Sequence, residues 1–146
     1  KKYGEKQVHI WRRSYDVAPP QLELKDIRHP SFDAKYHDLK SSILPRGECL
    51  KDTVNRVSPL WDDLIAPKIM LGQKILIVAH GNSLRALVKY LDKVLDKDII
   101  KLNIPTGMPL VYELDIKLNP LNHYYLGDSI EIEKRLARIK EQGKSN

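Results

Sequence analysis

Apolar residues recur at steps of three and four in four segments of the chain, and this spacing predicts helices. The first covers residues 5–13, and the second runs from residue 50 to residue 64. A third follows residue 83, and a fourth follows residue 128 near the end of the sequence. Between the first two lie residues 16–47, a stretch with four prolines and no clear period. A connection of this length inside a domain is typical of a lid or a binding loop.

A different pattern predicts three strands. Residues 74–79 form a continuous apolar run rich in β-branched residues, which is typical of a strand buried on both faces in a parallel sheet. Residues 110–114 and 121–126 are predicted to form two further strands joined by a turn. This order of strands and helices predicts an α/β sandwich. Because three strands are too few to flank the buried run on both sides, part of the domain is expected upstream of Lys1.

The sequence has 146 residues, 42% apolar and 30% charged, a composition typical of one globular domain. Its longest apolar run, residues 75–79, is far shorter than the ~20 residues that a membrane helix needs. No signal-peptide pattern stands at the front, so we expect a cytoplasmic protein that has no membrane partner. Cys49 is the single cysteine, which excludes an internal disulfide and a cysteine-based zinc site.

The net charge of +6 comes from 25 basic and 19 acidic residues. The surplus lies in the first twenty residues, where five basic residues accompany two acidic ones. Nucleic-acid-binding proteins spread Lys and Arg over a face and add aromatic or motif signatures, which this sequence lacks. The charge pattern therefore favours a small anionic ligand over nucleic acid. No metal site is expected, because the histidines other than His80 lack the spacing of metal ligands. These are His9, His29, His37 and His123.

The junction at residues 79–83 is the most informative place in the sequence. His80 follows the predicted buried strand and precedes a helix, which places it at the sheet edge where open α/β folds bind ligands. Gly81 lets the backbone approach a ligand closely, and the unpaired amides at the helix start favour an anion such as phosphate. His80 can then donate a hydrogen bond or a proton, and Asn82 an amide N–H. The pattern alone leaves open a purely structural histidine followed by an ordinary helix cap.

Arg12 and Arg13 end the first predicted helix, where cations complement the helix dipole. In a functional role the pair would clamp phosphate or carboxylate through bidentate guanidinium contacts. In a structural role it would be a solvated helix end, and the spacing does not decide between the two. P-loop, GxGxxG and GxSxG motifs do not occur in the sequence. P-loop nucleotide hydrolysis, a Rossmann cofactor site and serine-hydrolase chemistry therefore have no support.

Several strings, in order along nearly the whole chain, carry a resemblance to a known family. The strings are Tyr3-Gly4-Glu5, Ile10 to Tyr15, Glu48 to Thr53, Ala79 to Tyr90, Leu102 to Gly107, Pro109 to Leu114, His123 to Gly127 and Gln142-Gly143-Lys144. Together they resemble the cofactor-dependent phosphoglycerate mutases. The resemblance implies a three-layer α/β/α sandwich with a mostly parallel sheet, incomplete at the N-terminus. Residues 1–146 would form the C-terminal part of a single domain, with a mobile tail from about residue 140.

The activity implied by this resemblance is the glycolytic interconversion of 2- and 3-phosphoglycerate, a phosphoryl transfer through a phosphohistidine enzyme. The implied cofactor is 2,3-bisphosphoglycerate, which primes the enzyme, and no metal is implied. The resemblance makes His80 the second active-site histidine, which stabilises the charge of the transferred phosphoryl group. It makes Gly81 and Asn82 contacts of the phosphorylated substrate, and Arg12 and Arg13 clamps on its anionic groups. Because oligomers are frequent in the family, a homo-oligomer is implied by resemblance alone.

Two motifs of the family do not occur in the sequence. One is Arg-His-Gly on the first strand, which supplies the nucleophilic histidine. The other is Glu-Arg-His-Tyr-Gly, whose glutamate acts as general acid and base. We therefore expect the carboxyl-terminal part of a mutase, with half of an active site and no activity by itself. Two alternatives stay open, a bisphosphoglycerate synthase or phosphatase of the same superfamily and a catalytically inactive anion-binding fragment. Leu84 favours the mutase, because the synthases tend to carry a small polar residue there.

Overall fold

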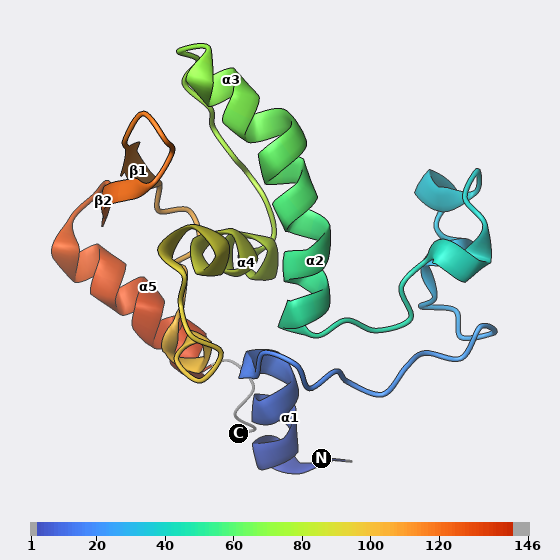
Figure 1. The fold of residues 1–146 in the computed structure, drawn as a ribbon. Coiled ribbons are helices and arrows are strands. Elements are labelled where there is room, and N and C mark those ends of the chain that lie inside the picture. Colours follow the sequence, from blue (N-terminus) through green and yellow to red (C-terminus); the bar gives the residue numbers. More distant parts are fainter. Residues whose placement is uncertain (1–2, 142–146) are drawn as a thin grey trace.

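Helix α4 (Gly81–Asp92) lies at the centre of the fold, with the other elements arranged around it (Figure 1). The coordinates are a computed structural model that describes residues 3–141. Short 3-10 turns lie at Pro30–Phe32, Ala34–Tyr36, Ser41–Ile43 and Ile99–Lys101. The other elements are α1 (Gly4–Arg13), α2 (Leu50–Leu60), α3 (Ala66–Met70), β1 (Leu110–Leu114), β2 (Pro120–Tyr125) and α5 (Ser129–Glu141).

The predicted helices are confirmed, and local sequence explains where they begin and end. Helix α2 begins after Cys49, whose backbone N–H donates to the Asp52 carboxylate at 3.0 Å. It contains Pro59, which lacks a backbone N–H, and the chain then continues through a π-helical turn at Trp61–Ile65 into α3. Gly72, with φ +81°, follows the end of α3. A left-handed glycine is a common helix terminator, because it has no Cβ to clash with the last turn.

The strand predicted at residues 74–79 does not form within the described residues. Within residues 3–141 no strand pairs with this segment, and Figure 1 shows it as an extended connection running from α3 to α4. Ile77 packs on the apolar core, whereas Leu76 and Val78 are 84% and 87% exposed. A strand needs a neighbour to pair its backbone groups, and the described part of the chain places none beside it. The predicted three-layer sandwich with a mostly parallel sheet is therefore not formed by these residues.

The sheet that does form is the antiparallel hairpin of β1 and β2, which confirms the pairing of the last two predicted strands. Tyr112 lies opposite His123 in its register. The turn is held by the Asp115 carboxylate, which accepts backbone N–H groups of Lys117 and Asn119, both at 2.8 Å. Leu118 takes up φ +62° in this turn. Side-chain acceptance of this kind stabilises a tight turn without help from the rest of the fold.

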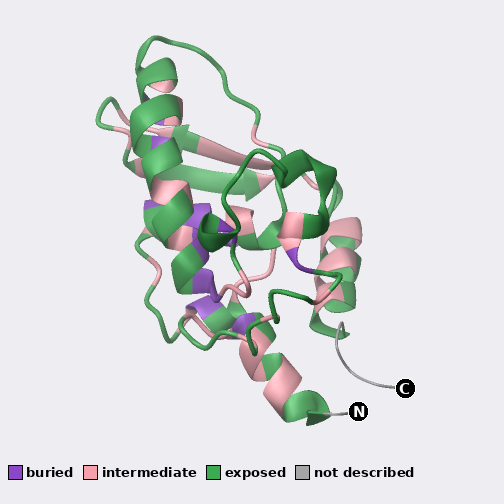
Figure 2. Cartoon of the chain, turned by 90° about the vertical axis from the view of Figure 1, so that its right-hand side faces the viewer, coloured by how far each residue is buried: buried purple, intermediate pink, exposed green. Residues whose placement is uncertain are grey.

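The apolar side of α4 is covered by α2 and by the hairpin. Leu87 and Leu91 join Trp61 in one buried cluster, and Tyr112 of β1 packs against it. A second buried cluster joins Leu50, Ala86 and Ile99, and ties the start of α2 to α4 and to the 3-10 turn at Ile99–Lys101. Figure 2 shows the buried residues gathered near the middle of the molecule, between mostly exposed segments. The buried part of α4 thus runs from Arg85 to Leu91, and the helix start beside His80 is exposed.

A hydrogen bond from the hairpin to the end of α4 gives a test of this packing. The Tyr112 hydroxyl donates to Asp92 Oδ2 at 2.9 Å, and His123 Nδ1 lies 3.5 Å from the same oxygen. Burial and the carboxylate raise the pKa of Tyr112 above its usual range. We expect Tyr112→Phe to lower the free energy of unfolding by about 1.5 kcal/mol, a typical value for a bond to a charged group. Urea unfolding at pH 7 measures this loss.

The control for this prediction is Tyr124→Phe on β2, where the ring is 42% exposed, and we expect a change within about 0.5 kcal/mol. The stability that Tyr112 contributes should be present below pH ~10, the usual pKa of an unfolded tyrosine. It should be lost as the pH rises toward the higher pKa of the folded state. Equal losses in the two variants would contradict the assigned role of Tyr112.

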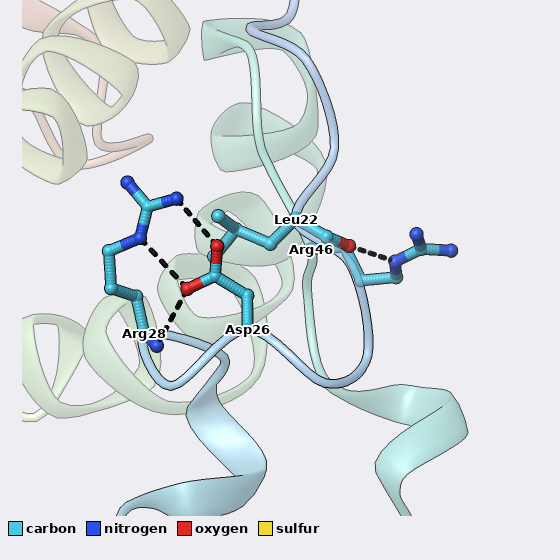
Figure 3. Close-up of polar contacts among 4 residues, drawn as sticks. All are labelled: Leu22, Asp26, Arg28 and Arg46. Atoms are coloured by element: carbon cyan, nitrogen blue, oxygen red, sulfur yellow. Dashed lines mark hydrogen bonds and ion pairs between the residues drawn. The ribbon is translucent and has the colours of Figure 1, made fainter.

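Residues 16–47 form the long connection predicted from the sequence, and they project from the helices (Figure 1). Its ends are tied by two bonds between Leu22 and Arg46, backbone to backbone at 2.8 Å and Arg46 Nε to Leu22 O at 2.6 Å (Figure 3). The Asp26 carboxylate accepts hydrogen bonds from the guanidinium and the backbone N–H of Arg28. These bonds hold the pKa of Asp26 below its usual range. The connection is therefore an ordered loop, and its use as a lid stays a prediction.

The predicted mobile tail falls largely on residues 142–146, which lie outside the described residues. Helix α5 carries the described chain to Glu141. Its start is capped by Asp128, whose Oδ1 accepts the backbone N–H of Glu131 at 3.0 Å. Within residues 3–141, each helix is too short or too polar to cross a lipid bilayer.

Candidate functional site

His80 caps the start of α4 with an exposed side chain. Its Nδ1 accepts the backbone N–H of Asn82 at 3.2 Å. A neutral imidazole that accepts at Nδ1 carries its proton on Nε2, so Nε2–H is the donor left for a ligand. The structural interpretation of His80, a helix cap, and the functional one, a ligand donor, are thus compatible because they use different ring nitrogens.

Asn82 and Arg12 meet at one guanidinium group. Nη1 of Arg85 donates to Asn82 Oδ1 at 3.2 Å and to the backbone oxygen of Arg12 at 3.4 Å. The end of α1 therefore lies against the start of α4, although 70 residues separate Arg12 from Asn82. The Arg12 side chain is exposed at this place. Four of the five predicted site residues, His80, Gly81, Asn82 and Arg12, thus belong to one surface region, here called the α1–α4 junction.

The two arginines at the end of α1 lie in different environments. Arg13 is 8% exposed, and its guanidinium donates to Asn103 Oδ1 at 2.5 Å and to the backbone oxygen of Ile139 at 2.8 Å. Burial and the neighbouring Arg12 charge lower the pKa of Arg13. Arg13 therefore connects α1 to the last turn of α5 in this structure. Its role as a substrate clamp stays a prediction, as does the role of Arg12.

Open space surrounds Gly81 at the start of α4. A Cβ placed on Gly81 would meet no atom within 4 Å, and the backbone there does not take a positive φ. Glycine is therefore not required at this position by the fold of residues 3–141. The first amides of a helix have no partner within the helix, and they carry the positive end of its dipole. The arrangement can accept an anionic group close to the backbone.

Sequence reasoning missed two residues that organise the junction, Arg85 and Asn103. Arg85 is 4% exposed and donates to four oxygen atoms, and Asn103 accepts from Arg13. A signal for Arg85 was present, because a cation stands between Leu84 and Val88 at the border of an apolar stripe. Asn103 gave no such signal, since its partner is distant in the sequence.

Cavities lie at the opposite end of α4 from His80. One of about 690 Å³ is lined by residues that include Lys89, Lys93 and Val94. Another of about 530 Å³ lies between the end of α4 and the hairpin, beside Asp92 and His123. Neither is lined by the predicted site residues. In the described residues, no three His, Cys, Asp or Glu side chains gather so as to hold a metal ion.

Comparison with known proteins gives consistent results. Residues 18–117 match the family described as "Histidine phosphatase superfamily (branch 1)". Two curated relatives, from Borreliella burgdorferi strains ZS7 and B31, are named 2,3-bisphosphoglycerate-dependent phosphoglycerate mutase. Each is 57% identical over 143 residues, which is 98% of this chain and 58% of the relative. The chain thus spans less than two thirds of the relatives' length. The resemblance stated from the sequence is confirmed, and the chain belongs to branch 1 of the histidine phosphatase superfamily.

Proposed function

We propose that this chain contributes the second-histidine side of a 2,3-bisphosphoglycerate-dependent phosphoglycerate mutase, which interconverts 2- and 3-phosphoglycerate. The observation that carries the proposal is the meeting of Asn82 and the Arg12 backbone on Arg85. This contact brings the helix start that holds His80 next to the end of α1. Identity of 57% to two relatives of that name supports the same activity.

The chemistry of phosphoryl transfer matches the donors at the junction. A phosphoryl group in transfer spreads negative charge over its equatorial oxygens, so positioning and electrostatic stabilisation account for most of the catalysis. We assign this stabilisation to Nε2–H of His80, and the binding of the substrate's anionic groups to Arg12 and Arg13. The nucleophilic histidine would come from the family's Arg-His-Gly motif, which these 146 residues do not contain.

The junction also suits the family's cofactor. The space over Gly81 and the amides at the start of α4 can hold an anionic phosphate group, and Asn82 adds a side-chain amide. When bound, 2,3-bisphosphoglycerate supplies the phosphoryl group that primes the enzyme. The proposal needs no metal, because guanidinium, imidazole and backbone donors supply the positive charge.

The proposal extends to the fold. Residues 1–146 would form the C-terminal part of one phosphoglycerate mutase domain, a three-layer α/β/α sandwich with a mostly parallel sheet. The exposed Leu76 and Val78 support this proposal, since an added parallel strand and a covering helix would bury them. The added strand and helix would correspond to the part of the relatives that this chain does not match.

Two other functions lead to different products. A bisphosphoglycerate synthase or phosphatase of the same superfamily would form or hydrolyse bisphosphoglycerate, and an inactive anion-binding module would form no phosphohistidine. Incubation with 3-phosphoglycerate, with and without 2,3-bisphosphoglycerate, separates these outcomes by product analysis. The name of the relatives favours the mutase.

Gly81→Ala tests the proposed anion contact in the chain as it stands. Because the backbone at Gly81 suits alanine and its surroundings are open, we expect unchanged stability or a gain of up to about 1 kcal/mol. The added methyl group would occupy space next to the helix amides and weaken 3-phosphoglycerate binding about tenfold, which is about 1.4 kcal/mol. NMR titration of the backbone amides measures both the affinity and the binding place.

The matched control is Ser83→Ala in the same helix turn, for which we expect affinity within about twofold of the unchanged chain. Chemical-shift changes should centre on residues 81–85 and on the end of α1. If 3-phosphoglycerate produces no shifts there, or if Gly81→Ala binds as well as the unchanged chain, the assignment of the junction as the substrate site is wrong.

A further inference from the structure

We infer that Arg85 is a positioning residue, which aligns the end of α1 with the start of α4 so that both helices present their donors to one phosphorylated ligand. The inference rests on the proposed function and adds a residue to it. Arg85 is buried beneath the α1–α4 junction, and we assign it no contact with substrate.

The contacts of Arg85 connect three segments of the chain. Nη1 donates to Asn82 Oδ1 and to Arg12 O, at 3.2 and 3.4 Å. Nη2 donates to Arg13 O at 3.3 Å and to Ile99 O at 2.8 Å. The last carbonyl groups of a helix have no partner within the helix, so the acceptors from α1 are groups that need an external donor. One guanidinium of α4 thus satisfies carbonyl groups at the end of α1 and also holds the Asn82 side chain at the start of α4.

Tyr15, two residues beyond α1, also ties this region to the core, since its backbone oxygen accepts the Lys51 N–H at 2.8 Å and its ring lies under Lys89 of α4. The main partner of α4 is α2, and α1 instead packs near the 3-10 turn at Ile99–Lys101. The side chain of Arg13 is directed to Asn103 and Ile139. Direct bonds from α4 to the α1 backbone come from Arg85. Arg85 is therefore the side chain of α4 that bonds the last carbonyl groups of α1 directly, and we assign to it the fine alignment of Arg12 with His80.

The environment of Arg85 shows that its charge is not used in an ion pair. All its recorded acceptors are carbonyl or amide oxygens, and its Nε is buried without a partner among the described residues. Burial and the Arg13 charge lower its pKa to about 10, so the group is still protonated at neutral pH. A buried cation without a carboxylate is costly, which is consistent with a geometric role. Its charge also adds positive potential beside the proposed anion site.

Lysine cannot reproduce this set of contacts. A guanidinium is planar and directs two terminal nitrogens to separate acceptors, whereas a lysine has one nitrogen on a flexible stem. Arg85→Lys keeps the charge but should lose the hydrogen bonds to at least one of the two helices. We expect 3-phosphoglycerate to bind about tenfold more weakly to this variant in NMR titration. The matched control is Arg56→Lys on α2, an exposed residue paired with Glu48, which should bind as the unchanged chain does.

A double-mutant cycle with Arg12→Ala separates positioning from general damage. If Arg85 acts by placing Arg12, then Arg12→Ala should weaken binding about tenfold in the unchanged chain but less than about threefold in Arg85→Lys. A merely structural effect of Arg85 would leave the loss from Arg12→Ala the same in both backgrounds. That result would overturn the inference, as would full affinity in folded Arg85→Lys.

A measurement on the unchanged chain covers the case in which Arg85→Lys does not fold. Side-chain NMR of Arg85 should show guanidinium protons protected from exchange, with shifts that move when 3-phosphoglycerate binds. Rapid exchange, or shifts that stay constant during binding, would contradict the inference. If the unchanged chain binds no 3-phosphoglycerate at all, the proposed function fails and this inference fails with it. If 3-phosphoglycerate binds but its affinity does not change on substitution of Arg85, the inference fails and the proposed function stands.

Discussion

The 146-residue chain alone is expected to give no detectable interconversion of 3- and 2-phosphoglycerate. The reaction of the family needs a nucleophilic histidine, which the resemblance places in an Arg-His-Gly motif, and this motif does not occur in the sequence. Oriented donors can stabilise a transferring phosphoryl group, but they cannot accept it. A coupled assay for 2-phosphoglycerate, with 2,3-bisphosphoglycerate present, measures the result.

Addition of a polypeptide that covers the unmatched part of the relatives should restore turnover. We expect it to pair with residues 74–79, where Leu76 and Val78 are exposed and Ile77 already packs on the core. Val78→Asp should abolish this restoration. The side chain is 87% exposed in the chain alone, so its own stability should hardly change, but assembly would bury an unpaired carboxylate. Since that burial costs several kcal/mol, we expect assembly at least ~100-fold weaker.

Ile116→Asp is the matched control for the assembly experiment. Ile116 is 91% exposed in the turn after β1, outside the segment proposed to pair, and this variant should be restored as well as the unchanged chain. Turnover by the chain alone would contradict the assignment of the nucleophile to polypeptide outside it. Equal restoration of Val78→Asp would show that residues 74–79 are not the assembly surface.

The predicted helices form, whereas the strand predicted at residues 74–79 does not form within the described residues. This difference has a physical origin. A helix pairs backbone groups four residues apart, so the residues of α1, α2 and α4 contain what each helix needs. The hairpin of β1 and β2 is also nearly local, because the Asp115 turn brings its strands together. Residues 74–79 have the composition of a buried strand, but pairing requires a partner that their own sequence does not specify. The pattern therefore indicates an environment that residues 3–141 do not supply.

The candidate site divides in the same way. His80, Gly81 and Asn82 are adjacent in sequence, so a strand-like run followed by a helix cap identified them together. The proximity of Arg12 to Asn82 depends on tertiary packing, which periodicity does not predict. The family resemblance was what assigned both residues to one site. Arg85 lay within the same helix and was overlooked, because an arginine beside an apolar stripe is usually a residue with a buried stem and a solvated charge.

His80→Ala in the assembled enzyme is expected to lower turnover by at least ~100-fold, which is the usual effect of removing one preorganised donor to a developing charge. The substitution also removes the Nδ1 acceptor of the Asn82 backbone N–H, and loss of a helix cap costs about 1 kcal/mol of stability. A fall in turnover could then reflect a frayed helix start. The two effects must be separated before the loss is assigned to the imidazole.

His80→Asn separates them, because asparagine is a strong helix cap but has no imidazole. We expect the unfolding free energy to return to within about 0.5 kcal/mol of the unchanged chain, while turnover stays at least ~100-fold low. His123→Ala on β2, a half-exposed histidine beside Asp92 at the other end of α4, should retain full turnover. Restoration of turnover in His80→Asn would mean that His80 acts as a helix cap alone. Near-normal turnover in His80→Ala would show that His80 has no role in the reaction. If both variants are slow but only His80→Ala is destabilised, Nε2–H is the group that the phosphoryl transfer requires.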